Sequence, residues 1–263
     1  MDFFQPENSL NNLSRTSSVA MLFNGFFLED KIKGYETLKV SGREVLSYQL
    51  SSNSNISGRD GSLILEKTLP DRLLKITYRI MAEDNKELQN QFRQLNSLLN
   101  TDSDVPIRFK DDIDFTFYGQ VKDFEEVADD TNNIVSTFTI LCSNPYKFEK
   151  EYSITGNPAK IQKETFPTNP EEIRITLKEA TNMVKLLNKK SGKKIILSHE
   201  YSANDIIIIN ISKNKITVNG ESRMQDLAFE VTDFHGFTVE KDDEISVTPI
   251  NSELEITVRS KWK

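Results

Sequence analysis

Residues 73–80 read LLKITYRI, and residues 84–100 read DNKELQNQFRQLNSLLN. In the first stretch every second residue from position 74 onward is apolar, which is the pattern of a strand with one buried face. In the second stretch Leu88, Phe92 and Leu95 recur at helical spacing, with polar residues between them. A single amphipathic helix needs a surface to cover, and the surrounding strands are the candidate. The first part of the chain is therefore predicted to be α+β and mostly β.

The ends of this helix carry their own signals. Asp84 is predicted as the N-cap and Glu87 as its partner three residues on, so the helix is expected over residues 84–100. Around it, short β-branched and aromatic runs separated by Gly, Asn, Asp and Pro predict strands. These runs are 19–23, 62–66, 73–80, 115–121 and 134–141.

A domain boundary is predicted after the run Cys142-Ser143-Asn144-Pro145-Tyr146, where a proline closes a strand and charged residues follow. We place the boundary near residues 147–158 and divide the chain into domains 1–146 and 147–263.

The second domain has the pattern of an all-β sandwich of roughly eight strands. Residues 206–209 are four consecutive isoleucines, which favour a strand covered on both faces over a helix. Asn219-Gly220 is a strong hairpin-turn dipeptide. Further strands are expected at 171–177, 205–211, 216–218, 234–240, 244–249 and 254–259. The stretch 178–194 has the weakest pattern.

Composition and charge exclude several classes of protein. The 263 residues include 33 basic and 40 acidic side chains, one Cys and two His. Residues 1–146 hold 15 basic and 22 acidic side chains and residues 147–263 hold 18 of each, so the net charge of −7 belongs to the first domain. An acidic chain does not favour a dedicated DNA-binding role. One Cys excludes an internal disulfide framework, and neither a signal peptide nor a membrane span is recognisable, so synthesis in the cytoplasm is expected.

No catalytic, cofactor-binding or metal-binding residues are predicted. His199 and His235 lie outside metal or nucleophile motifs and are expected at the surface or at strand ends. Cys142 is expected to be a buried thiol with no activating base. The clustered aspartates lack the ligand spacing of a calcium loop, so we interpret them as turn and loop residues. Trp262 is expected to pack on its own core rather than to stack on a sugar.

Gly58-Arg59-Asp60-Gly61 resembles a phosphate loop only superficially, because no Lys-Ser/Thr follows and no strand–helix unit surrounds it. We interpret it as a turn between strands.

A series of motifs follows in order along the chain: Gly58-Arg59-Asp60-Gly61, Leu69-Pro70-Asp71-Arg72, the helix end Leu98-Leu99-Asn100, Asp104-Val105-Pro106-Ile107-Arg108-Phe109, Phe117-Tyr118-Gly119 and Cys142-Ser143-Asn144-Pro145-Tyr146-Lys147. Taken together, the series resembles the distal tail protein family of long-tailed bacteriophages and their prophages. The resemblance covers about residues 16–150 and depends on order and spacing. The second domain matches as a β-rich region that carries residues 216–220, ITVNG.

The resemblance implies a mainly β, non-enzymatic structural protein of the virion tail tip. Its N-terminal β-sandwich with one helix would form a homohexameric ring around the DNA exit channel, and its C-terminal sandwich would be similar to galectin or carbohydrate-binding modules. A hairpin arm, expected near residues 35–59, would embrace the neighbouring subunit, and Gly58, Arg59, Asp60 and Gly61 are the candidate interface residues. Cyclic symmetry requires head-to-tail contacts that close into a ring.

The implied partners are other copies of the chain, the tail tube protein, the tail-associated lysin or tail-tip protein, the tape measure protein and a receptor-binding protein. DNA would pass through without specific binding. We hypothesise that an acidic ring wall repels phosphates during ejection, whereas a basic wall would retain them; acidic loops that dock onto basic neighbours are the rival explanation.

Two other functions remain open from sequence. A carbohydrate-binding module recognising cell-wall glycans predicts an exposed aromatic platform in a groove. A tail-associated hydrolase is less favoured, because no acid–base or nucleophile constellation is recognisable.

Overall fold

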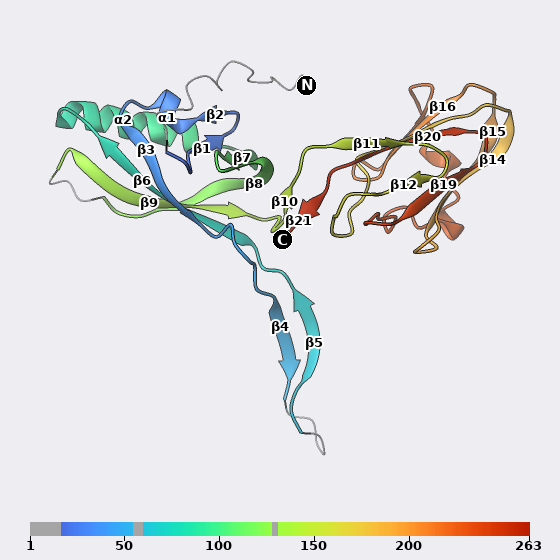
Figure 1. Cartoon of the computed structure of the whole chain (residues 1–263), viewed down its shortest axis with the longest axis horizontal. Coiled ribbons are helices and arrows are strands. Elements are labelled where there is room, and N and C mark those ends of the chain that lie inside the picture. Colours follow the sequence, from blue (N-terminus) through green and yellow to red (C-terminus); the bar gives the residue numbers. More distant parts are fainter. Residues whose placement is uncertain (1–16, 55–59, 128–130) are drawn as a thin grey trace. The chain divides into compact units, whose positions relative to one another are not determined.

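The structure is a computed structural model that describes residues 17–54, 60–127 and 131–263. Its contacts divide the chain into two compact units (Figure 1). The first unit ends at Lys147, with Lys263 added to it, and the second unit runs from Phe148 to Trp262.

The first unit is one folded sheet with a helix over it. Along the sheet the strands follow the order β2-β1-β7-β8-β9-β6-β3. The 13-residue strand β8 pairs with β7 through its first half and with β9 through its second half, so the two halves of the sheet enclose one core. The elements are β1 (Met21–Phe23), β2 (Phe26–Phe27), α1 (Leu28–Lys31), β3 (Tyr35–Ser41), β6 (Arg72–Met81), α2 (Asn85–Leu99), β7 (Val105–Phe109), β8 (Asp112–Phe124) and β9 (Asn133–Cys142), followed at the boundary by β10 (Lys147–Phe148).

Strand β6 has the predicted alternation. Leu74, Ile76, Tyr78 and Ile80 are buried, and the residues between them are exposed or half-buried. Ten consecutive residue pairs join β6 to β9, from Arg72 opposite Cys142 to Met81 opposite Asn133. This ladder forms the centre of the unit.

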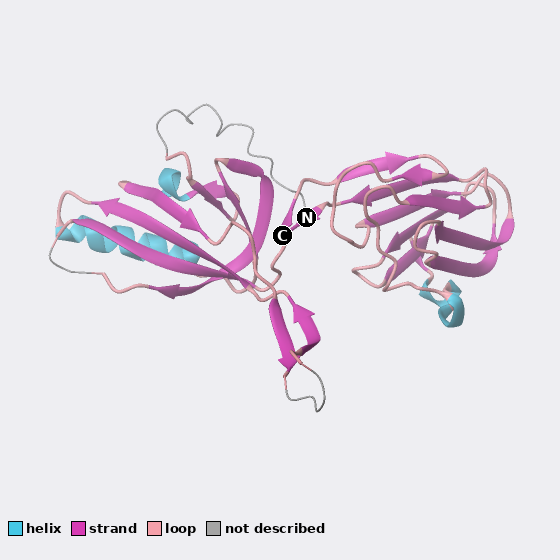
Figure 2. Ribbon diagram, turned by 60° about the horizontal axis from the view of Figure 1, so that its bottom comes forward, coloured by secondary structure: helices cyan, strands magenta, loops and turns pink. Residues whose placement is uncertain are grey.

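Helix α2 confirms the expected range and its cap. The Asp84 side chain accepts a hydrogen bond from the Glu87 amide at 2.7 Å. The Glu87 carboxylate in turn accepts a hydrogen bond from the Glu83 amide. In a standard capping box it would accept from the amide of the cap residue, Asp84. Leu88, Leu95 and Leu99 are buried in the same core as β6, and Figure 2 shows the helix lying over the sheet.

The arm begins later in the chain than the predicted range of residues 35–59. Tyr35–Ser41 is strand β3, which pairs with β6 in the main sheet, and Tyr35, Thr37 and Val40 are buried there. Only the later part of that range leaves the sheet, in β4 (Gln49–Asn53), which pairs with β5 (Leu63–Thr68) as a separate two-stranded sheet.

The second unit is a two-sheet sandwich. One sheet has the order β11-β20-β13-β16-β17-β18 and the other β12-β19-β14-β15, and buried residues of both sheets form one core. The strands are β11 (Tyr152–Thr155), β12 (Ala159–Lys160), β13 (Glu172–Thr176), β14 (Thr181–Asn188), β15 (Lys194–Tyr201), β16 (Ile206–Asn210), β17 (Lys215–Val218), β18 (Glu221–Ser222), β19 (Glu244–Thr248) and β20 (Glu253–Val258), with β21 (Lys261–Trp262) at the end and two 3-10 turns, η2 (Met224–Asp226) and η3 (Phe229–Val231).

Two features of this sandwich refine the sequence predictions. The Asn219-Gly220 hairpin is confirmed: both residues have positive φ, 51° and 88°, and Val218 pairs with Glu221 across the turn. The isoleucine strand is buried on one face only. Ile207 and Ile209 lie in the core, whereas the residues at 206 and 208 are half-buried on the outer face.

The predicted strand at 234–240 is wrong. Phe234 and Phe237 are buried, but they enter the core from turns, and only Val239 makes a bridge, to Thr168. The weakly patterned stretch 178–194 contains β14, a strand whose alternate residues Val184 and Leu186 are buried.

Replacing Asp84 by Ala removes the acceptor of the Glu87 amide. We expect the free energy of unfolding of the first unit to fall by about 1 kcal/mol. Urea unfolding of the full chain, followed by far-ultraviolet circular dichroism, measures the change. Asp102→Ala is the matched control, because Asp102 is exposed in a loop; equal losses in the two variants would contradict the capping role.

The neighbouring isoleucines of β16 provide a second test. Ile207→Ala opens a cavity in the core and is expected to lower the free energy of unfolding by about 3 kcal/mol. Ile208→Ala removes a half-buried side chain and is expected to cost about 1 kcal/mol. Fluorescence of the single tryptophan, Trp262, follows unfolding of the second unit. Equal losses at both positions would show that the outer face of β16 is as well covered as the inner one.

Candidate functional site

The chain leaves the main sheet of the first unit at a glycine. Gly42, directly after β3, has a φ of +91°, and a Cβ built on it would lie 2.0 Å from the carbonyl oxygen of Leu73. Both the backbone angle and the lack of space require glycine here. Residues 43–71, which we call the arm, then extend away from the sheet and return to β6 at Arg72 (Figure 1).

The base of the arm is tied to the sheet by polar contacts. The guanidinium of Arg43 donates to both carboxylate oxygens of Asp111, at 2.7 and 2.9 Å, and lies over the ring of Phe109. The buried Arg72 donates to backbone carbonyls on the other side of the base. A two-oxygen contact between guanidinium and carboxylate fixes orientation as well as distance.

Beyond its base the arm buries none of its hairpin residues. Every residue of β4 and β5 is exposed. The pairing runs from Gln49 opposite Thr68 to Asn53 opposite Leu63, with a bulge that skips Leu65. An isolated two-stranded hairpin has marginal stability in water, because it has no core of its own.

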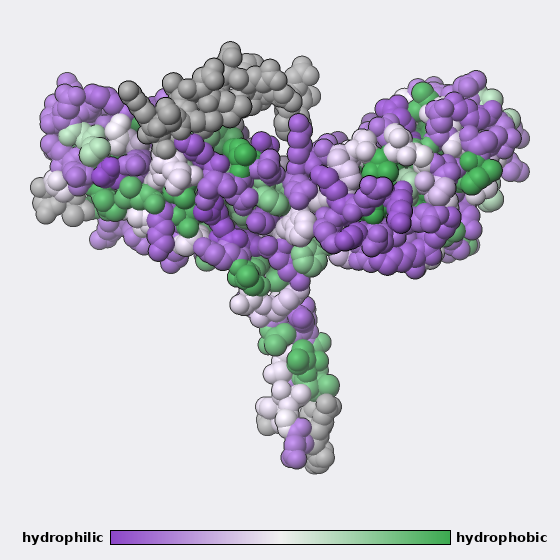
Figure 3. Space-filling model, in the orientation of Figure 1, coloured by the Kyte–Doolittle hydropathy of each residue, from purple (hydrophilic) through white to green (hydrophobic). Residues whose placement is uncertain are grey.

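The arm is nevertheless rich in exposed apolar side chains. Val45 is 94% exposed, Leu50 54%, Ile64 56% and Leu65 63%. Figure 3 shows hydrophobic patches on the arm, with polar residues between them. Exposed apolar patches on a projecting element indicate a site of protein–protein contact.

Of the four predicted interface residues, Gly58 and Arg59 lie outside the described residues, and Asp60 and Gly61 precede β5 on the arm. Asp60 and Gly61 are exposed, and the positive φ of Gly61, +83°, fits the predicted turn. Their role in an interface stays a prediction.

The residues considered for chemistry are dispersed. His199 and His235 are exposed, on the surface of the second unit. Trp262 is half-buried, and its indole N–H donates to Glu149 at 3.0 Å. Within the described ranges, no group of three or more His, Cys, Asp or Glu side chains could hold a metal ion. Those ranges also contain no helix long and apolar enough to cross a membrane.

Cys142 lies at the end of β9 and is completely buried. Burial raises the pKa of its thiol to about 12, although the nearby positive charge of Arg72 opposes the shift. The thiol is therefore unreactive at neutral pH.

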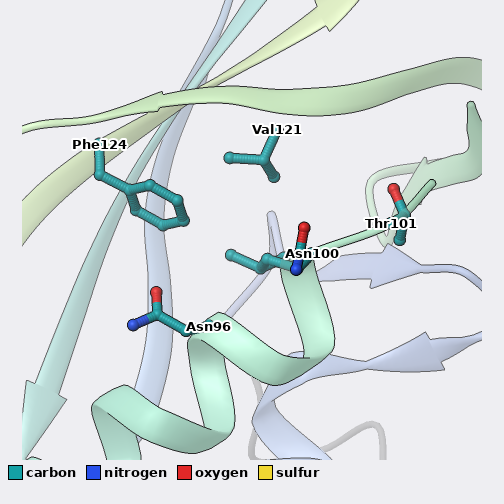
Figure 4. A pocket seen from close by; sticks show the side chains of 6 residues that line it. Asn96, Asn100, Thr101, Val121 and Phe124 are labelled. Carbon is teal, nitrogen blue, oxygen red and sulfur yellow. The ribbon is translucent and has the colours of Figure 1, made fainter. Parts of the chain in front are cut away.

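Two hollows were considered as ligand sites. One, of about 300 Å³, lies beside the end of α2, between Val121 and Phe124 of β8 and Asn96 and Asn100 (Figure 4). It presents amide and hydroxyl groups but no ionisable side chain. The other, of about 510 Å³, lies in the second unit, and its lining combines charged, small polar and apolar residues, among them Arg174, Glu253, Glu255, Ile250 and Leu254. Its lining includes no aromatic ring on which a sugar could stack.

Sequence reasoning identified the tip of the arm but not its apolar flanks or its base. The run Leu63-Ile64-Leu65 was assigned to a strand, and three consecutive apolar residues in a strand leave at least one on each face. In a strand with no covering layer in its own unit, this run is a signal for an external partner.

Comparisons with known proteins match both units. Residues 25–142 match the family model described as phage tail protein RIFT-related domain, and residues 165–262 match that described as siphovirus-type tail component, C-terminal domain. The chain is 27% identical over 225 residues to the distal tail protein of Bacillus phage SPP1, covering 80% of this chain and 84% of the relative.

Solved structures extend this likeness. The chain superposes on the crystal structure of SPP1 Dit with a TM-score of 0.74 and 19% identity, over 92% of this chain and 99% of that one. That protein is described as a paradigm of the hub of the adsorption apparatus in phages that infect Gram-positive bacteria. A chain of the phage P2 baseplate is also similar, with 11% identity and a TM-score of 0.48, over 85% of this chain and 90% of that one.

Reagents that modify thiols test the burial of Cys142. We expect the native protein to react with an aromatic disulfide reagent at least about a hundred-fold more slowly than a Ser52→Cys variant, because the thiolate is both shielded and scarce. Ser52 is exposed on the arm and provides the matched accessible thiol. Comparable rates for the two thiols in the folded state would refute the assignment.

Proposed function

The chain belongs to the distal tail protein family of siphovirus-type phages, and from this we infer that it is a structural hub at the distal end of a phage tail. The family matches fall on both units, and the fold agrees with that of SPP1 Dit over nearly the whole chain. The relatives are a distal tail protein and a protein described as the hub of an adsorption apparatus. We therefore place this chain at the tail tip, as a non-enzymatic assembly protein.

The observation that carries the mechanism is the arm. Its described apolar side chains are exposed, and burial of such side chains against a partner molecule would be favourable. In a homomeric assembly the arm of one copy meets a different surface on the next, which is a heterologous contact. We propose that six copies close such contacts into a ring around the DNA exit channel.

The net charge of the first unit does not say which of its surfaces would form an acidic channel wall. On the sheet face opposite the core, the register places Lys39 opposite Thr77, Lys75 opposite Ser41 and Arg79 opposite Glu36. The acids gather instead near the start of α2, in the loop at 102–104, and at the turn and first residues of β8, 111–114. An electrostatically repelling wall would have to be built from those segments rather than from the open sheet face.

Carbohydrate binding by the second unit is the less supported alternative. Of the larger aromatic side chains described there, Phe229 is strongly exposed, at 66%, but it does not line the charged hollow. Sugar recognition commonly pairs an aromatic platform with convergent polar groups. The hollow offers the second without the first.

The remaining partners follow from the position of a hub. We propose that the ring contacts the tail tube protein on one side and the tail-associated lysin or tail-tip protein on the other. The tape measure protein, and a receptor-binding protein at the periphery, complete the set. DNA would cross the ring without specific binding.

Replacing the apolar side chains of the arm tests the ring. We expect Leu50→Ser, Ile64→Ser and Leu65→Ser together to reduce the hexamer fraction at least about ten-fold, because burial of their apolar area would be lost. Native mass spectrometry of the full chain measures the fraction, with and without the tail tube protein. Phe229→Ser, an equally exposed apolar site outside the arm, is the control. A hexamer that survives the triple change would show that the arm is not the interface, and a monomer in all samples would refute the ring.

A further inference from the structure

The direction of the arm is decided at its base. The hairpin β4–β5 has no buried residue and makes its strand pairs only within itself. None of these strand residues packs into the core of the first unit, and directly before β4 the Tyr48 hydroxyl accepts a hydrogen bond from the Lys263 ammonium. If the arm must reach a neighbouring copy, its orientation depends on the few residues where it leaves and rejoins the sheet.

Arg72 is the residue at which these segments converge. Its side chain is fully buried, at the first position of β6, where the returning arm enters the sheet. Nη1 donates to the carbonyl oxygens of Gly42 at 2.7 Å and Glu44 at 3.1 Å, both on the outgoing side of the arm. Nε donates to the carbonyl of Pro145 at 2.8 Å, in the segment that follows β9. One guanidinium thus joins three pieces of chain.

This arrangement does not have the chemistry of a stabilising ion pair. Among the described residues, no carboxylate lies within salt-bridge distance of Arg72, and Nη2 is buried without a hydrogen-bond acceptor. The ring of Phe117 lies 5.5 Å from the guanidinium carbon, and the Glu44 carboxylate acts on the charge without forming an ion pair with it. Burying a cation in this way is unfavourable for folding compared with an apolar side chain of the same size. A geometric role accounts for its presence better than a contribution to stability.

The shape of the side chain suits that role. A guanidinium is planar, carries five N–H donors in fixed directions and stays charged. It can bind several carbonyl groups at once and hold them at fixed angles. A lysine ammonium at the end of a flexible stem cannot reproduce that pattern.

We propose that Arg72 is the positioning residue of the arm, fixing the direction in which the hairpin leaves the first unit. The proposal rests on the proposed function, in that a fixed direction serves docking onto a neighbouring copy. Two adjacent features act with it. Gly42 supplies the backbone angle that only glycine adopts easily, and its amide donates to the Glu44 carboxylate at 2.8 Å. Arg43, the residue after Gly42, donates a hydrogen bond to Asp111.

Distance measurements between two spin labels on the full chain test the proposal. One label is attached at Ser52→Cys on β4 and the other at Lys86→Cys on α2, both exposed positions, while the buried Cys142 does not react. Labelled protein is diluted with unlabelled protein of the same sequence, so that only distances within one chain are recorded. In the wild-type background we expect one narrow distance distribution.

In the Arg72→Met background we expect the distribution to widen at least about two-fold, with the helical circular dichroism signal retained. Arg72→Lys should widen it as well, because the charge remains but the fork of donors is lost. Ile76→Val, on the same strand and away from the arm base, lowers core packing and should leave the width unchanged. This control separates loss of direction from general destabilisation.

An unchanged width in both Arg72 variants would overturn the proposal, and so would equal widening in Ile76→Val. If Arg72→Met fails to fold, Arg72→Lys carries the comparison. The distances are measured within one chain, so they test the positioning role even if the wild-type protein forms no ring. If rings do form, the hexamer fraction should fall at least ten-fold in Arg72→Met, and a full hexamer with a widened distribution would show that arm direction does not matter for assembly.

Discussion

The ladder between β6 and β9 is the constraint on which the rest of the first unit depends. Its ten pairs bring together two strands that are separated by about fifty residues of sequence, including α2. The middle of the ladder presents Ile76 and Tyr78 to the core under the helix. At one end of the ladder Arg72 pairs with Cys142. This is the point where the arm returns to the sheet, a few residues before the end of the first unit. A change in register by one residue would turn the core face outward and would also move the base of the arm.

Much of the fold could be predicted, because its strongest elements carry local signals. Helix α2 and strand β6 each bury one face, so their periodicity is written in consecutive residues, and the cap at Asp84 depends on a neighbour three positions away. The Asn219-Gly220 turn is equally local. The two-residue strands β12 and β18 were missed because they are too short to show alternation. Residues 234–240 show an apolar pattern but form no strand. Phe234 and Phe237 are core residues in and next to a turn, and apolar content alone does not distinguish a turn from a strand.

The site was less accessible to sequence reasoning. Strand β3 and the arm have similar composition, and only pairing with β6 shows that the first belongs to the sheet. Arg72 reads as an ordinary charged residue before a strand. Its burial depends on carbonyl groups of residues 42, 44 and 145, which are brought together by the complete fold. Every residue has a backbone carbonyl whatever its side chain, so no sequence motif indicates which carbonyls will bind Arg72.

The burial of the single thiol, Cys142, affects how the protein responds to an oxidising medium outside the cell. A virion component is made under reducing conditions and then works in an oxidising medium, where exposed cysteines link to one another or oxidise. Cys142 is enclosed under the sheet with a raised pKa, and the sequence contains no second cysteine with which it could pair inside the chain. While the first unit stays folded, this thiol is therefore protected from oxidation and from forming a disulfide with another chain.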